Sequence, residues 1–166
     1  MAKAHTVGRW KGANMGFEPE ITAFSCIYCG YTAIDTAGAL HLTYPASVKI
    51  VRLPCTGKLD ALYLLSSFEQ GADGVLVVAC PLGNCHHVRG NERARARVER
   101  VQELLKRIGL ESDRVKMIFV SGGQGATVAR EANALVTRVQ ELGPSPLKAS
   151  GRAASMSAEA SAAPVR

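Results

Sequence analysis

Four short apolar runs constrain the fold of this chain more than any other feature: residues 21–25 (ITAFS), 48–53 (VKIVRL), 74–79 (GVLVVA) and 115–120 (VKMIFV). Such nearly continuous runs, rich in β-branched residues, are typical of strands buried on both faces of a sheet. A segment with a helical pattern follows each run, at residues 31–42, 58–70, 91–108 and 126–142. Strands that alternate with helices, joined by right-handed crossovers, predict an α/β fold. We expect a three-layer sandwich around a four-stranded parallel sheet, flavodoxin-like in plan.

Apolar stripes predict which faces of two of these helices are buried. The stripe of the 58–70 helix consists of Leu59, Leu62, Leu65 and Phe68. The stripe of the 91–108 helix consists of Val98, Val101, Leu104, Leu105 and Ile108. Gly109 follows directly and is expected to end that helix.

Composition divides the chain into one domain and two flanking segments. The chain has 166 residues and is 47% apolar, enough for a single domain with a hydrophobic core. We predict that residues 20–143 form this α/β domain. Residues 1–19, rich in glycine and charge, are predicted to form an irregular N-terminal arm. Residues 144–166 are small and polar and bury too little surface to order themselves, which predicts a flexible Ala/Ser-rich tail.

Charge and hydropathy narrow the possible partners and the compartment. The net charge is +6, but aromatic residues make up only 5% and no basic stretch is interleaved with them, so nucleic acid is not expected as a partner. Basic residues gather between positions 89 and 107, which indicates a solvated helix face or a contact with an acidic protein. No run is long enough to span a membrane, and the N-terminus has no apolar secretory segment. We therefore predict a cytoplasmic protein, in which structural disulfides are rare.

The five cysteines fall at related places in this pattern. Cys26, Cys55 and Cys80 stand at or just after the ends of three predicted strands, and Cys29 and Cys85 lie in the loops that follow two of them. In a parallel sheet these positions share one edge, the edge at which open α/β sheets bind ligands. If the first strand lies between the second and the third, all five thiols come from three neighbouring strand ends.

Three kinds of chemistry compete for such a thiol group. Zinc requires a closed tetrahedron; the Cys26/Cys29 spacing suits one half, but the Cys80/Cys85 spacing is looser than in zinc knuckles. A thiol–disulfide site would use Cys26 and Cys29 and leave the other cysteines without a role. An iron–sulfur cluster needs four thiolates from more than one segment, which this chain offers.

Two features of the surrounding residues favour the cluster. The loops contain Gly30, Gly57, Gly83 and Gly90, which allow backbone amides to approach sulfur, and the basic run would stabilise a negatively charged cluster. His86 and His87 could replace thiolates, but with five cysteines present we expect them to have a supporting role. The glycine-rich segment 121–127 (SGGQGAT) lacks a phosphate-binding lysine and is interpreted as a tight turn whose glycines need positive φ.

The cysteine motifs resemble those of a known family. Residues 26–29 (CIYC), 52–57 (RLPCTG) and 80–91 (CPLGNCHHVRGN) together resemble the delta subunit of methyl-viologen-reducing hydrogenase. The resemblance extends over residues 20–143. It departs from the family pattern at Tyr28, where the family usually has tryptophan, and at His87, where tyrosine is common.

The resemblance implies a function for the predicted domain. It implies a [2Fe-2S] cluster held by four of the five cysteines, namely Cys26, Cys29, Cys55, Cys80 and Cys85. It also implies a small electron-transfer subunit rather than a stand-alone catalyst. The implied partners are a subunit of a hydrogenase or dehydrogenase and a heterodisulfide reductase A-like flavoprotein, in a hetero-oligomeric complex. A thiol–disulfide or zinc-binding regulatory module is the alternative.

Overall fold

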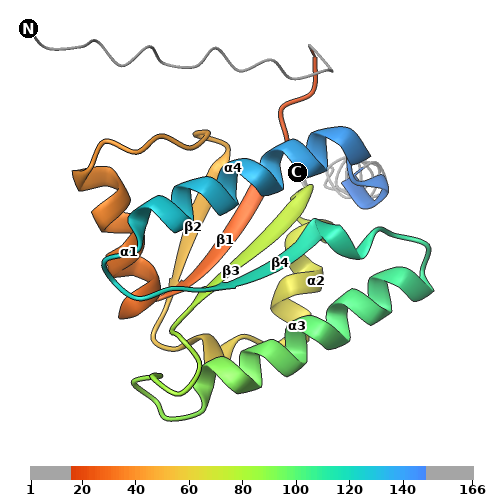
Figure 1. Ribbon diagram of the computed structural model, residues 1–166. Coiled ribbons are helices and arrows are strands. Elements are labelled where there is room, and N and C mark those ends of the chain that lie inside the picture. Colours follow the sequence, from red (N-terminus) through yellow and green to blue (C-terminus); the bar gives the residue numbers. More distant parts are fainter. Residues whose placement is uncertain (1–15, 149–166) are drawn as a thin grey trace, which may run out of the picture.

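The computed structural model describes residues 16–148, which contain a four-stranded sheet; Figure 1 shows its arrangement with the helices. The strands are β1 (Ile21–Cys26), β2 (Val48–Leu53), β3 (Gly74–Ala79) and β4 (Val115–Phe119). All neighbouring pairs are parallel, and the order is β2-β1-β3-β4. The predicted parallel sheet is therefore confirmed, and β1 does lie between β2 and β3.

Four helices cover the two faces of the sheet. They are α1 (Cys29–Ala39), α2 (Ala61–Glu69), α3 (Gly90–Arg107) and α4 (Gly125–Leu142), with short 3-10 turns at η1 (Thr56–Lys58) and η2 (Ser112–Arg114). Helices α1 and α4 lie on one face and α2 and α3 on the other, which confirms the three-layer α/β sandwich (Figure 1). Within residues 16–148, no helix combines the length and the apolar character that crossing a bilayer requires.

The sheet divides the hydrophobic core into two halves. Every residue of β3 is buried, as expected for an inner parallel strand. On β1, Ala23 faces the core shared with α1 and α4, and its neighbour Phe24 faces the core shared with α2 and α3. A fully buried side chain such as Phe68 contributes about 1.5–3 kcal/mol relative to exposure. The two half-cores hold the strand ends, and with them the cysteines, in place.

Helix α2 differs from its prediction in start and in phase. It begins only after the η1 turn, and the Asp60 carboxylate caps it by accepting a hydrogen bond from the Leu62 amide at 3.0 Å. Leu62 is 69% exposed, so the predicted stripe is wrong at this residue. The buried face is instead set by Leu64 and Phe68, which are four residues apart and therefore lie on the same side.

The predicted stripe of α3 is also wrong at its last residue. The helix ends at Arg107, and Ile108 is 61% exposed because the chain turns away there through Gly109. Gly109 has a φ of +81°, which confirms that it ends the helix. Helix α1 begins at Cys29, two residues earlier than predicted. This cysteine therefore lies in the first turn of the helix.

A buried carboxylate closes the amino edge of the sheet. Asp73 is fully buried and accepts hydrogen bonds from the Glu20 amide at 3.0 Å, the Ser145 amide at 2.9 Å and the Lys148 Nζ at 3.1 Å. These partners offset the cost of burying a charge. Residues 144–148 thus pack against the domain. The rest of the predicted tail and most of the predicted arm lie outside the described residues, and the domain limits remain a prediction.

Candidate metal centre

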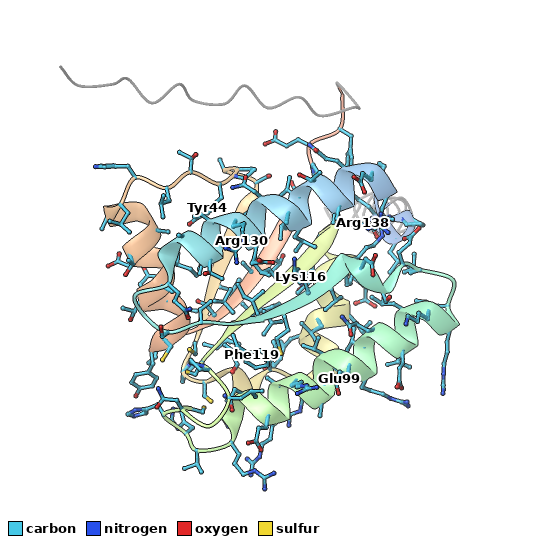
Figure 2. All side chains as sticks on the ribbon, viewed as in Figure 1. Tyr44, Glu99, Lys116, Phe119, Arg130 and Arg138 are labelled. Atoms are coloured by element: carbon cyan, nitrogen blue, oxygen red, sulfur yellow. The ribbon has the colours of Figure 1, made fainter. Side chains whose placement is uncertain are left out.

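The carboxyl edge of the sheet brings the predicted cysteines together. Cys26 ends β1, Cys55 and Cys80 follow the ends of β2 and β3, Cys29 begins α1, and Cys85 lies in the loop before α3. Figure 2 shows sulfur atoms gathered at this edge, beside the loop that leads into α3. The Sγ atoms of Cys26 and Cys80 are 3.4 Å apart.

The remaining thiols are linked to this pair. The side chains of Cys55 and Cys85 contact each other, Cys29 contacts Cys80, and Cys80 also acts electrostatically on Cys55. All five cysteines are free thiols. The structure therefore joins the five residues that the sequence singled out into one group.

Burial raises the pKa of three of these thiols. It raises the pKa of Cys26 to about 12, with a further contribution from Cys80, although the Gly30 amide donates to the Cys26 sulfur at 3.1 Å and opposes the shift. Burial likewise raises the pKa of Cys29 and of Cys55. Without a bound cation, these groups are held in the neutral thiol form at pH 7.

Cys85 behaves in the opposite way. Burial acts to raise the pKa of its thiol, but the backbone amides of Asn91, His87 and Gly90 donate to the sulfur and together lower the pKa below its ordinary value. A contact with the Cys55 thiol adds to this stabilisation. Cys85 therefore becomes a thiolate, the form that binds metals, more readily than the three thiols whose pKa burial raises.

Two glycines allow the loops that carry Cys55 and Cys85 to meet. A Cβ atom on Gly90 would overlap the Cys55 Sγ and lie 3.3 Å from the Cys85 Sγ. A Cβ on Gly57 would lie 2.7 Å from the Gly90 Cα, closer than real side chains approach. The start of α3 and the η1 turn thus pack backbone to backbone, and the space beside the two sulfurs exists only because neither residue has a side chain.

Two polar side chains of α3 hold these loops. Asn91 is fully buried and its amide donates to the Cys80 carbonyl at 3.0 Å. Arg97 donates from one guanidinium nitrogen to the carbonyls of Gly57 and Leu59, each at 2.7 Å. Sequence reasoning missed Arg97, which lay within a basic run interpreted as a solvated face. The one signal that could have separated Arg97 from the other arginines of this run is its position, two helical turns after Gly90 at the closely packed start of α3.

The two histidines lie beside the thiols rather than among them. The His86 ring stacks on Tyr28 with ring centroids 3.9 Å apart, and His87 packs edge-on against both rings. This arrangement agrees with a supporting role, although that role stays a prediction.

The segment 121–125 is a turn that packs on α1. The Gln124 side chain accepts a hydrogen bond from the Ser121 amide at 2.8 Å, and Thr36 donates to the Gly122 carbonyl at 2.8 Å. A Cβ on Gly125 would meet the backbone of Ala37 in α1 at 2.5 Å. A Cβ on Gly122 would meet the Thr32 side chain of the same helix at 2.9 Å. Gly122 and Gly125 therefore serve close packing against α1, and the expected positive φ is wrong, since no glycine of this segment has one.

The donor set fits a thiolate-bound metal centre. Two sulfurs on one tetrahedral ion lie about 3.8 Å apart when each bond is about 2.3 Å, close to the separation of Cys26 and Cys80. The Thr56 hydroxyl next to Cys55 is buried and has no hydrogen-bond partner within the described residues, so a bound group would supply one. As the side chains lie, no three His, Cys, Asp or Glu residues among positions 16–148 are arranged to hold one metal ion. Binding therefore requires the thiols to turn toward a common centre.

Fold and site together define a small α/β protein with a group of thiols at the carboxyl edge of a parallel sheet. The family described as methyl-viologen-reducing hydrogenase, delta subunit, matches residues 21–143. The chain belongs to this family, as the cysteine motifs had indicated.

Curated relatives agree with this assignment. An iron-sulfur subunit of the F420-non-reducing hydrogenase vhu of Methanocaldococcus jannaschii is 45% identical over 132 residues, 80% of this chain and 98% of that protein. Its counterpart from Archaeoglobus profundus is 38% identical over 128 residues, 77% of this chain and 93% of the relative. One subunit of the ferredoxin/F420H2-dependent CoB-CoM heterodisulfide reductase of Methanosarcina acetivorans is 32% identical over 126 residues, 76% of this chain but 16% of that protein.

Proposed function

We propose that this chain is an electron-transfer subunit that carries a [2Fe-2S] cluster on four of its five cysteines. The observation that carries the proposal is the linked group of thiols at the carboxyl edge of the sheet. Soft thiolate donors without carboxylates favour iron–sulfur clusters or zinc over harder cations. When bound, such a cluster would accept and release one electron at a time.

The protein would prepare the site in three ways. Asn91 and Arg97 fix the two loops, so the thiols need only rotate. The Gly30 and Gly57 amides donate to the sulfurs of Cys26 and Cys55, at 3.1 and 3.3 Å, and such donors stabilise the charged thiolate. Positive charge on α3 adds to this effect. Four thiols must lose their protons for the cluster to bind, so assembly would depend on pH.

The relatives suggest the partners. Several are named as hydrogenase iron-sulfur subunits, and in Methanosarcina acetivorans the matching stretch forms part of a larger heterodisulfide reductase polypeptide. We propose that this chain relays electrons between a subunit of a hydrogenase or dehydrogenase and a heterodisulfide reductase A-like flavoprotein. It would do so within a cytoplasmic hetero-oligomeric complex.

One observation favours a second candidate, a thiol–disulfide module. The Cys26 and Cys80 sulfurs touch, so oxidation could join them directly. This pair differs from the Cys26/Cys29 pair expected from the sequence. The candidate leaves the other three thiols of the group without a role, and we place it second.

Anaerobic purification tests the proposal. The expected result is a coloured protein with two irons and two acid-labile sulfides per chain, and an electron paramagnetic resonance signal on reduction. Alanine substitution of each cysteine should abolish the visible absorption for four residues and spare it for one. A colourless protein that contains zinc or no metal after anaerobic reconstitution with iron and sulfide would refute the cluster.

A further inference from the structure

Two loops above the thiols expose apolar and aromatic side chains to solvent. We call this surface the thiol-edge patch; it consists of Ile27, Tyr28, Leu82, His86, His87 and Val88. The exposed fractions are 46% for Ile27, 49% for Leu82 and 78% for Val88. Such residues occur singly on most surfaces, but here they come from two neighbouring loops at one edge.

Ring contacts join the two loops into one surface. Tyr28, from the connection between β1 and α1, stacks on His86, from the loop that precedes α3. The centroid of His87 lies 5.8 Å from that of Tyr28 and 5.3 Å from that of His86. The patch therefore has a defined shape, set by packed rings.

The patch lies next to the two least buried thiols. Tyr28 directly precedes Cys29, and His86 directly follows Cys85. Cys29 and Cys85 are partly exposed, whereas the other three cysteines are buried. A protein that covers the patch would therefore lie next to the two thiols that are nearest to solvent, where electrons have the shortest distance to cross.

The backbone at Val88 is strained. Its φ is +61°, a conformation that β-branched residues strongly disfavour. The Arg89 amide donates to the His87 carbonyl at 2.7 Å, closing a three-residue turn around Val88. This strained turn holds an apolar side chain out in water, with 78% of the residue exposed. Strain retained at such a place points to a contact outside the chain.

The charges at this edge are mainly positive. The cations at the edge or in the adjacent helical turn are Arg52, Lys58, Arg89 and Arg93. Glu92 pairs with Arg89 at 2.7 Å, so these two charges offset each other, and Asp60 caps α2. Arg52, Lys58 and Arg93 therefore leave an excess of positive charge at this edge. An apolar centre with a basic border complements an apolar surface bordered by carboxylates.

We infer that the thiol-edge patch is the docking surface for a redox partner protein whose contact area is apolar and bordered by carboxylates. This inference rests on the proposed function, because it assigns the surface through which the cluster exchanges electrons. A second copy of this chain does not suit the patch, since two copies would bring the same cations together.

Site-specific crosslinking in the native host tests the position of the contact. The photo-crosslinking residue p-benzoylphenylalanine replaces Val88 in one strain, and in the control strain Ile108, which is 61% exposed at the far end of α3. We expect the Val88 variant to crosslink to a copurifying protein, at a peptide that contains Asp or Glu, at least ten times more than the control. Equal crosslinking from both positions, or no crosslink from Val88 while the proteins still copurify, would overturn the inference.

Charge variants at the same residue test the chemistry of the partner. Asp and Lys both tolerate this backbone better than valine does, so neither variant threatens the fold. We expect Val88→Asp to reduce the copurified partner at least tenfold and Val88→Lys to reduce it less, with both effects smaller at high salt. The reverse order would refute a carboxylate border.

The visible absorption of each purified variant separates this inference from the proposed function. Neither Val88 nor Ile108 is a proposed ligand, so every variant should retain the wild-type spectrum. A wild-type chain without a cluster refutes the proposed function. Intact clusters with equal partner binding by Val88→Asp and the control Ile108→Asp refute the docking surface alone.

Discussion

Replacing Gly90 with alanine tests whether the close approach of α3 to the η1 turn creates the metal centre. The added methyl group would overlap the Cys55 Sγ and press against the Cys85 Sγ, 3.3 Å away. The Cys55 sulfur would have to turn away from its present position, because the close packing of the Gly57 and Gly90 backbones leaves the loops no room to move closer.

The size of the effect follows from overpacking. Inserting a methyl group into a tightly packed place costs about 1–3 kcal/mol. Replacing a helical glycine with alanine by itself raises the free energy of unfolding by about 0.5–1 kcal/mol at best. Gly90→Ala should therefore lower the free energy of unfolding by up to about 2.5 kcal/mol, the difference between these ranges. Displacement of Cys55 should also remove most of the bound cluster.

The matched control is Gly38→Ala. Gly38 lies within α1, and a Cβ there would meet nothing within 4 Å. This substitution should raise stability by about 0.5–1 kcal/mol and leave the cluster unchanged. The assays are urea unfolding of the metal-free chain and iron content after anaerobic reconstitution. Wild-type iron content and stability in Gly90→Ala would refute the reasoning.

Three further predictions concern other parts of the structure. Asn91→Ala leaves the Cys80 carbonyl without its donor; we expect a loss of about 1–3 kcal/mol in urea unfolding and a lower iron content, and unchanged values would contradict this role. If the Thr56 hydroxyl, unpartnered within the described residues, donates to a sulfur of the bound cluster, Thr56→Val should retain the cluster but make its midpoint potential more negative in a redox titration; an equal potential would show that this hydroxyl points elsewhere. The pKa of Glu131 is lowered, chiefly by its hydrogen bond to Lys116 against the effect of burial, so its contribution to stability is complete above about pH 4.3 and disappears as the pH falls through the folded-state pKa. Glu131→Gln should therefore flatten the decline of the urea midpoint between pH 5 and pH 3, and an identical decline would contradict the ion pair.

Local sequence patterns predicted most of the fold. A buried parallel strand needs a continuous apolar run, and its end is marked where the run stops, so the positions of Cys26 and Cys80 could be placed without a structure. Chain direction in a parallel sheet then put the thiols on one edge. The buried face of α2 was harder to predict from the sequence. Leu62 fits the helical spacing of apolar residues, but it lies in the first turn of the helix, and the buried face is set further along by Leu64 and Phe68.

The sequence by itself therefore determined the α/β class, the parallel sheet and the placement of the thiols on one edge, since apolar runs mark the strand ends and parallel strands share one direction. The tertiary structure decided that β1 lies between β2 and β3, which makes the three strand ends neighbours. Only the tertiary structure decided which sulfurs touch, since Cys26 meets Cys80 rather than the nearby Cys29. It also revealed Arg97 as the side chain that holds the loop of Cys55, and Val88 as a strained apolar residue at the surface. The Arg97 contact depends on how closely α3 approaches η1, and the Cys26–Cys80 contact depends on the pairing of β1 with β3. Both are set by packing between segments far apart in the chain, which no local pattern records.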